Sequence, residues 1–99
     1  MDYKRTETKE EERFVVFELK DDSMSPCFKI GDEIEVDTRA DVKNGDIVVA
    51  IIEDGRIIMR QMHKRNDEYM FFPSDSRYDI IFSENPLIIG RAVRYYRKL

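Results

Sequence analysis

The stretch with the residue types for chemistry is Asp21-Asp22-Ser23-Met24-Ser25-Pro26, which follows an apolar run. Pro26 fixes its own φ and moves Ser25 away from helical backbone angles. We therefore expect Ser23 to lie in a tight bend outside any regular element. A serine in such a bend is a candidate nucleophile. It is equally an ordinary turn or N-cap residue, because Ser and Asp side chains bond nearby backbone groups.

A nucleophilic serine needs a base, and a lysine whose pKa is lowered by burial can serve. The natural place for that base is the return strand of a hairpin predicted over residues 46–62, the expected centre of the fold. The polar residue there is Arg60, flanked by Met59 and Met62. A guanidinium does not lose its proton in a protein, so Arg60 is no general base.

Two further groups of residues allow a function. The acidic set Asp21, Asp22 and Asp32 could do acid–base chemistry or bind a cation. Its spacing matches no known metal-binding loop, so we interpret these residues as solvent-exposed acids of turns. The second group is a basic tail that combines arginines with tyrosines, which suits either stacking on nucleic acid or pairing with a second copy of the chain. We favour the pairing; the tail consists of Arg91, Arg94, Tyr95, Tyr96, Arg97 and Lys98.

Composition limits the function classes. The chain has 99 residues, of which 41% are hydrophobic and 38% charged, enough for one domain with one modest core. A net charge of −4 argues against binding of this domain to the phosphate backbone of a nucleic acid. One cysteine, Cys27, and one histidine, His63, exclude an internal disulfide and disfavour zinc. We expect no metal, no cofactor, no membrane span and a cytoplasmic location.

The pattern along the chain predicts strands separated by Gly, Asn and Pro turn signals. Residues 1–13 are polar and are expected to form a flexible linker or tail, with one domain over 14–99. Gly90 is expected at a bulge or at a close approach of two backbones. Residues 63–67 are expected to be a charged loop. The predicted all-β domain has strands at 14–19, 33–37, 46–52, 56–62, 68–72, 79–82 and 87–96.

The ordered series of motifs resembles the C-terminal domain of LexA and phage CI-type repressors, the self-cleaving serine peptidase family that includes UmuD. The resemblance rests on Asp22-Ser23-Met24-Ser25-Pro26, Gly31-Asp32, Asn44-Gly45-Asp46-Ile47-Val48-Val49-Ala50, Ile58-Met59-Arg60-Gln61-Met62, Phe72-Pro73-Ser74-Asp75-Ser76 and Ile88-Ile89-Gly90-Arg91-Ala92-Val93. It implies a fold of coiled antiparallel β-sheets with a small barrel. It also implies a homodimer and a Ser–Lys dyad that cuts an Ala-Gly or Cys-Gly bond upstream.

Motif by motif, Ser23 matches the family's nucleophile, and Arg60 stands where the family has its lysine. Asp21 stands where a glycine is common, and no Ala-Gly or Cys-Gly pair occurs in the chain. We therefore expect the dimerising, regulatory domain of a LexA/CI-like repressor whose self-cleavage is lost. In this reading the C-terminal strand forms the dimer, and DNA is bound only through an N-terminal helix-turn-helix domain that this sequence lacks.

Two alternatives stay open. One is an active autopeptidase of the same family with His63 or Lys64 as base, and the other is a UmuD-like partner of a polymerase. Type I signal peptidases share a Ser-Met-x-Pro box, but they need the same lysine and a membrane anchor, so we set that reading aside.

Overall fold

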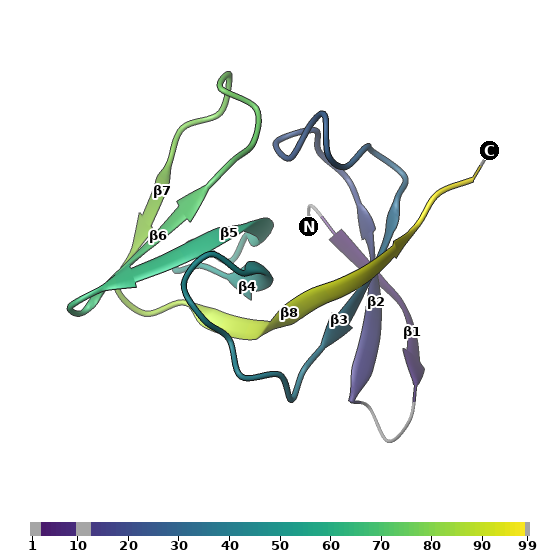
Figure 1. The fold of residues 1–99 in the computed structure, drawn as a ribbon, viewed down its shortest axis with the longest axis horizontal. Helices are drawn as coiled ribbons and strands as arrows, with labels where there is room; N and C mark the ends of the chain where they lie inside the picture. The colour runs from purple at the N-terminus through teal and green to yellow at the C-terminus, as the bar shows by residue number, and fades with distance from the viewer. Residues whose placement is uncertain (1–2, 10–12, 99) are drawn as a thin grey trace.

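The computed structural model describes residues 3–9 and 13–98 of the chain, and these residues form strands and loops (Figure 1). Nowhere in these two ranges is there a helix long and apolar enough to cross a membrane. The strands are β1 (Tyr3–Lys9), β2 (Phe14–Leu19), β3 (Glu33–Asp37), β4 (Ile47–Ile51), β5 (Ile57–Arg65), β6 (Glu68–Phe72), β7 (Ile81–Ser83) and β8 (Leu87–Tyr96).

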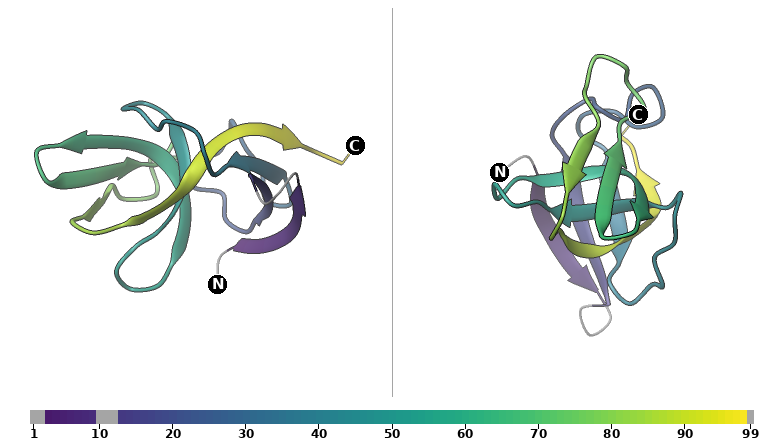
Figure 2. Two further views of the ribbon diagram at one scale, coloured as in Figure 1. Left: turned by 90° about the horizontal axis from the view of Figure 1, so that it is seen from below. Right: turned by 90° about the vertical axis from the view of Figure 1, so that its left-hand side faces the viewer.

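The strands form one antiparallel sheet in the order β1-β2-β3-β8-β4-β5-β6-β7, which coils strongly (Figure 2). The predicted all-β class is therefore confirmed. The small barrel is not closed, because β1 and β7, at the two ends of the order, each pair with one strand only within the described residues. Closure would need these two strands to pair, and β7 has only three residues.

Strand β8 joins the two halves of the sheet and crosses the whole molecule (Figure 1). Its first half, from Leu87 to Arg91, pairs with β4, and its second half, from Arg91 to Tyr96, pairs with β3. Gly90 lies where these pairings change over. A Cβ added there would lie 2.3 Å from the backbone oxygen of Asp37, so the predicted close approach of two backbones is confirmed.

Strands β4 and β5 lie between two hydrophobic clusters, because alternate residues of each strand point to opposite faces. This explains the continuous apolar run over residues 47–52, since both faces of β4 are covered. The first cluster contains Val15, Phe17, Leu19, Met24, Ile34, Val36, Val49, Ile57 and Met59. The second contains Val48, Ala50, Ile52, Ile58, Met62 and Phe71.

Two segments differ from the sequence-based expectation. Residues 63–65, expected in a charged loop, continue β5 and pair with residues 68–70 of β6. The side chains of these residues are partly or fully exposed, so their charges stay in contact with solvent while the backbone forms a strand. Tyr3–Lys9, inside the expected tail, form β1 and pair with β2. The domain boundary at residue 13 stays a prediction.

Candidate functional site

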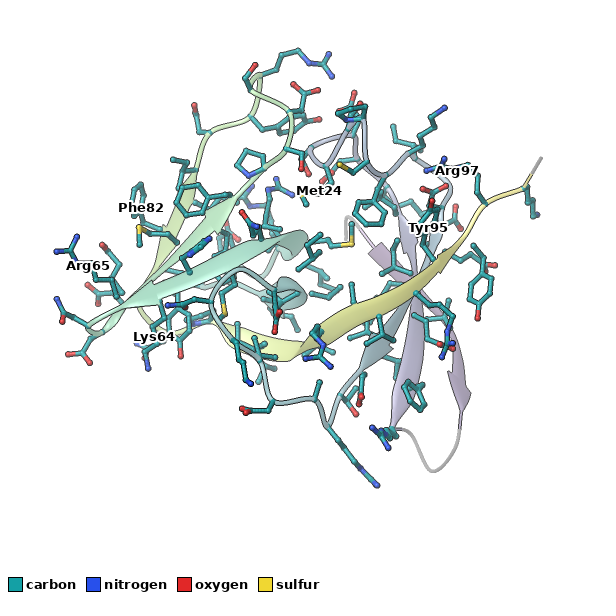
Figure 3. All side chains as sticks on the ribbon, viewed as in Figure 1. Met24, Lys64, Arg65, Phe82, Tyr95 and Arg97 are labelled. Carbon is teal, nitrogen blue, oxygen red and sulfur yellow. The ribbon has the colours of Figure 1, made fainter. Side chains whose placement is uncertain are left out.

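Ser23 lies in the bend between β2 and β3, as its neighbours predict, and its side chain is fully buried. Tight turns follow in succession, because the amide of Ser25 donates to the carbonyl of Asp22 at 3.0 Å and that of Phe28 to the carbonyl of Met24 at 3.0 Å. Met24 extends into the first hydrophobic cluster and anchors the bend to the core (Figure 3). The bend therefore holds Ser23 against the interior of the sheet.

Arg60 of β5 reaches Ser23 across the fold. Its Nη1 donates a hydrogen bond to Ser23 Oγ and a second one, of 2.9 Å, to the carbonyl of Met59. The arginine is only 3% exposed, and its Nε is buried without a hydrogen-bond partner among the described residues. The structure thus brings together the two residues that the sequence singled out, while their catalytic roles stay predictions.

Asp21 is the third member of this group, and the sequence did not assign it a role at Ser23. The hydroxyl of Ser23 donates to Asp21 Oδ1 at 2.6 Å, and the amide of Ser23 donates to the same oxygen at 3.0 Å. A guanidinium only donates and a carboxylate only accepts, so the direction of both hydroxyl bonds is fixed. The Ser23 hydrogen therefore points at Asp21, and an oxygen lone pair points at Arg60. The sequence signal that could have indicated this contact is the Asp-x-Ser spacing, because an Asp side chain often bonds the backbone amide two residues further along.

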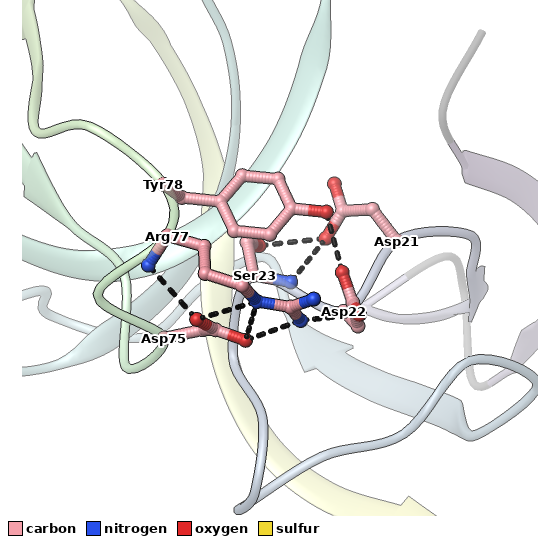
Figure 4. Close-up of polar contacts among 6 residues, drawn as sticks. All are labelled: Asp21, Asp22, Ser23, Asp75, Arg77 and Tyr78. Atoms are coloured by element: carbon pink, nitrogen blue, oxygen red, sulfur yellow. Dashed lines mark hydrogen bonds and ion pairs between the residues drawn. The ribbon is translucent and has the colours of Figure 1, made fainter.

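The β6–β7 loop, residues 73–80, packs against the Ser23 bend (Figure 4). The amides of Ser74 and Asp75 both donate to the carbonyl of Ser23 at 2.9 Å. The ring of Tyr78 lies over the guanidinium of Arg60, with 5.7 Å between Cζ and the ring centroid. These contacts hold the loop against the bend in which Ser23 is buried.

Side chains reinforce this packing (Figure 4). Arg77 bridges two carboxylates, with Nη2 2.7 Å from Asp22 Oδ2 and 2.6 Å from Asp75 Oδ2. The hydroxyl of Tyr78 donates to the other oxygen of Asp22. The bonds from Tyr78 and then Arg77 hold the pKa of Asp22 below its ordinary value. Asp22 is therefore engaged with the β6–β7 loop and not with Ser23 or Arg60.

The two other bases considered for Ser23 do not reach it. Lys64 lies four residues beyond Arg60 on β5, about 13 Å along a strand, and its Nζ lies 5.2 Å from the ring centroid of Tyr69. Figure 3 shows Lys64 near the β5–β6 turn, away from Met24 and the Ser23 bend. His63 points to the opposite face of the strand and packs edge-to-face on Phe72 at 5.2 Å.

The acidic set does not converge on one point. Asp21 bonds Ser23, Asp22 bonds Arg77 and Tyr78, and Asp32 is bonded by Arg97. Over residues 13–98, no three His, Cys, Asp or Glu side chains are grouped so that they could hold a metal ion.

The arginines of the basic tail are each paired with an acid. Arg94 Nε lies 2.7 Å from Glu35 Oε1, Arg97 Nη2 lies 2.8 Å from Asp32 Oδ2, and Arg91 Nη1 lies 3.7 Å from Asp46 Oδ2. Glu35 and Asp32 are buried. This tail therefore presents little uncompensated positive charge, which disfavours its interpretation as a nucleic-acid surface.

A protein-family model matches nearly the whole chain. The family model described as Peptidase S24-like matches residues 1–93. The chain belongs to the Peptidase S24-like family. This S24-like chain is 29% identical over 69 residues to the LexA repressor of Staphylococcus epidermidis, which covers 70% of the chain and 34% of that protein.

Two further relatives match more of the S24-like chain. The LexA repressors of Staphylococcus carnosus and Staphylococcus aureus strain Newman are 28% and 26% identical to it over 94 residues. Each of these alignments covers 95% of the chain and 45% of the relative. The chain thus spans less than half the length of the relatives it matches.

Proposed function

We propose that this chain is the dimerisation and regulatory domain of a LexA/CI-like transcriptional regulator in which self-cleavage has been lost. The observation that carries the proposal is the hydrogen bond from Arg60 to Ser23. The family resemblance and the LexA relatives support the regulatory context.

The loss of cleavage follows from the chemistry of the two side chains. A Ser–Lys dyad needs a neutral amine that accepts the hydroxyl hydrogen. Arg60 remains protonated and can only donate, so it cannot take that hydrogen. Ser23 is also fully buried, and amides of the β6–β7 loop bond its backbone carbonyl, so its Oγ is not presented to a peptide. The pair instead ties the bend to β5.

The proposed dimer forms along β8. The second half of β8 pairs with β3 on one side, and no described strand pairs with residues 92–95 on the other side. The exposed fractions of Val93, Tyr95 and Tyr96 are 39%, 47% and 45%, and an open strand edge beside apolar side chains favours pairing with a second strand. A hollow of about 120 Å³ beside Phe28 and Val93 offers space for a partner's side chain.

DNA binding in this proposal belongs to a separate helix-turn-helix domain of the regulator, and the protein acts in the cytoplasm. The net charge of −4 and the paired arginines of the tail support a domain that does not itself bind the DNA backbone.

The test is incubation of the purified full-length protein at alkaline pH, where a dyad lysine would be neutral, followed by intact-mass measurement. We expect a single uncleaved species in each sample, at the mass calculated for the unmodified protein and for Ser23→Ala respectively. A fragment that forms in the unmodified protein and is lost in Ser23→Ala would overturn the proposal.

A further inference from the structure

The Ser23 hydroxyl lies between a carboxylate and a guanidinium, and both bonds have a fixed direction. We propose that Asp21 is a second residue that silences the site, because it keeps a basic group at position 60 charged and takes the Ser23 hydrogen. This inference rests on the proposed function, since it concerns the same lost dyad.

Charge balance around position 60 points to Asp21. Arg60 is a buried cation, and a buried cation needs a compensating charge. None of the ion pairs between described residues includes Arg60. Asp21 is the carboxylate linked to it through one atom, because both side chains bond the same oxygen atom of Ser23.

The other charged groups near position 60 are engaged elsewhere, of the wrong sign, or not bonded to Arg60 or Ser23. Asp22 and Asp75 are bonded by Arg77, and Arg56 is paired with Asp54 at 2.8 Å. A cleft of about 490 Å³ brings Arg56, Arg77, Tyr78 and Asp79 together with Arg60. Of these groups, Tyr78 is a phenol engaged with Asp22, and Asp79 makes no described bond to Arg60.

The consequence concerns a lysine placed at position 60. A carboxylate within a few ångströms favours the ammonium form, which has no lone pair for the Ser23 hydrogen. The hydroxyl would still donate to Asp21. Arg60→Lys alone therefore does not rebuild a dyad; the neutral amine forms at accessible pH only when the carboxylate at position 21 is also removed.

The test is to titrate the lysine introduced by Arg60→Lys, followed by NMR of its ε-carbon, alone and together with Asp21→Asn. The matched control combines Arg60→Lys with Asp22→Asn, which removes the same charge from the neighbouring residue of the same bend. We expect Asp21→Asn to lower the lysine pKa by about 1 or more. We expect Asp22→Asn to lower it clearly less. Equal effects of the two substitutions, or no effect of Asp21→Asn, would overturn the inference.

A second measurement keeps the inference falsifiable if Arg60→Lys does not fold. It is a double-mutant cycle of Asp21→Asn and Arg60→Gln, read from denaturant unfolding, with Asp22→Asn in place of Asp21→Asn as control. We expect a favourable coupling for the first pair that exceeds that of the control pair. A coupling no larger than the control would contradict the role of Asp21.

Neither readout depends on cleavage. A protein that cleaves itself while the titration behaves as expected would refute the lost activity, but the effect of Asp21 on the charge at position 60 would stand. If the protein does not cleave itself and Asp21→Asn leaves the pKa of the introduced lysine unchanged, the lost activity stands and the role of Asp21 is refuted.

Discussion

The guanidinium of Arg97 holds the carboxylate of Asp32 through two hydrogen bonds, from Nε to Oδ1 at 2.9 Å and from Nη2 to Oδ2 at 2.8 Å. Asp32 is 1% exposed and lies in the loop that follows the Ser23 bend, whereas Arg97 follows β8. Next to this pair, Phe28 and Tyr95 pack edge-to-face at 5.3 Å, and Figure 3 shows Tyr95 and Arg97 together at this end of β8. The end of β8 is thereby fastened to the segment that carries Ser23.

Arg97→Lys should weaken this fastening although it keeps the charge, because an ammonium lacks the planar fork that fits a carboxylate. We expect a lower melting temperature and a rise in the pKa of Asp32, which the bonds from Arg97 now hold below its ordinary value. Thermal unfolding and carboxyl NMR check this. Arg56→Lys is the matched control, because its pair with Asp54 is exposed on both sides and should contribute little. Equal losses in the two variants would contradict the expectation.

Glu53 should make stability depend on acid pH. The bond from the Ser83 hydroxyl, followed by the amide of Glu84, lowers the pKa of Glu53 to about 2 from 4.5. A depressed folded-state pKa gives stability that is fully present above pH 4.5 and is lost as the pH falls toward 2.

We therefore expect Glu53→Gln to flatten the fall in unfolding free energy between pH 4.5 and pH 2, measured by urea denaturation at a series of pH values. An unchanged slope in this window would show that the Glu53 contacts do not persist in solution. Asp54→Asn, in the same turn, serves as the comparison.

Gly90→Ala should cost about 3 kcal/mol, because the new methyl group would lie 2.3 Å from the carbonyl oxygen of Asp37 and force β3 and β8 apart. Gly55→Ala separates this clash from backbone strain, since Gly55 has a φ of +88° but open space around its Cβ position. It should cost about 1 kcal/mol. Denaturant unfolding of both variants checks the difference, and similar costs would rule out the clash.

Val93→Asp should shift the protein from dimer to monomer, because it places a charge at the open edge of β8 proposed to pair with a second copy. Sedimentation velocity across a concentration series measures this. Phe82→Asp is the control, since Phe82 is 59% exposed on β7, the strand that ends the sheet order four strands away from β8 (Figure 3). A dimer that survives Val93→Asp but is lost in Phe82→Asp would move the interface to β7.

Most strands could be predicted from the chain alone. Alternation or uninterrupted apolar runs mark Phe14–Leu19, Glu33–Asp37, Glu68–Phe72 and Leu87–Tyr96, and each is a strand with these bounds. Residues 63–65 were wrongly expected in a loop, because their charges hide a strand whose pairing depends on β6, a partner that local composition does not reveal. The open sheet was also not visible, since closure depends on how its two end strands lie in space.

The site could be predicted only in part. The proline-directed bend and the family resemblance single out Ser23 and Arg60, and the structure brings them together. The contacts of Asp22 with Arg77 and Tyr78 join residues more than fifty positions apart, and no local pattern relates them. The direction of the Ser23 hydroxyl was missed for another reason. It depends on a carboxylate that the sequence alone assigns to an ordinary turn.

The course of β4, β5 and β8 between the two hydrophobic clusters has a thermodynamic consequence. Strands β4 and β5 contribute residues to both clusters, and Ile88, Ile89 and Ala92 of β8 pack against them. We therefore expect that neither cluster melts while the other survives intact. Heating should therefore give a single calorimetric peak whose area matches the van't Hoff enthalpy. The two packed regions behave as one cooperative unit, despite a sheet whose ends never meet.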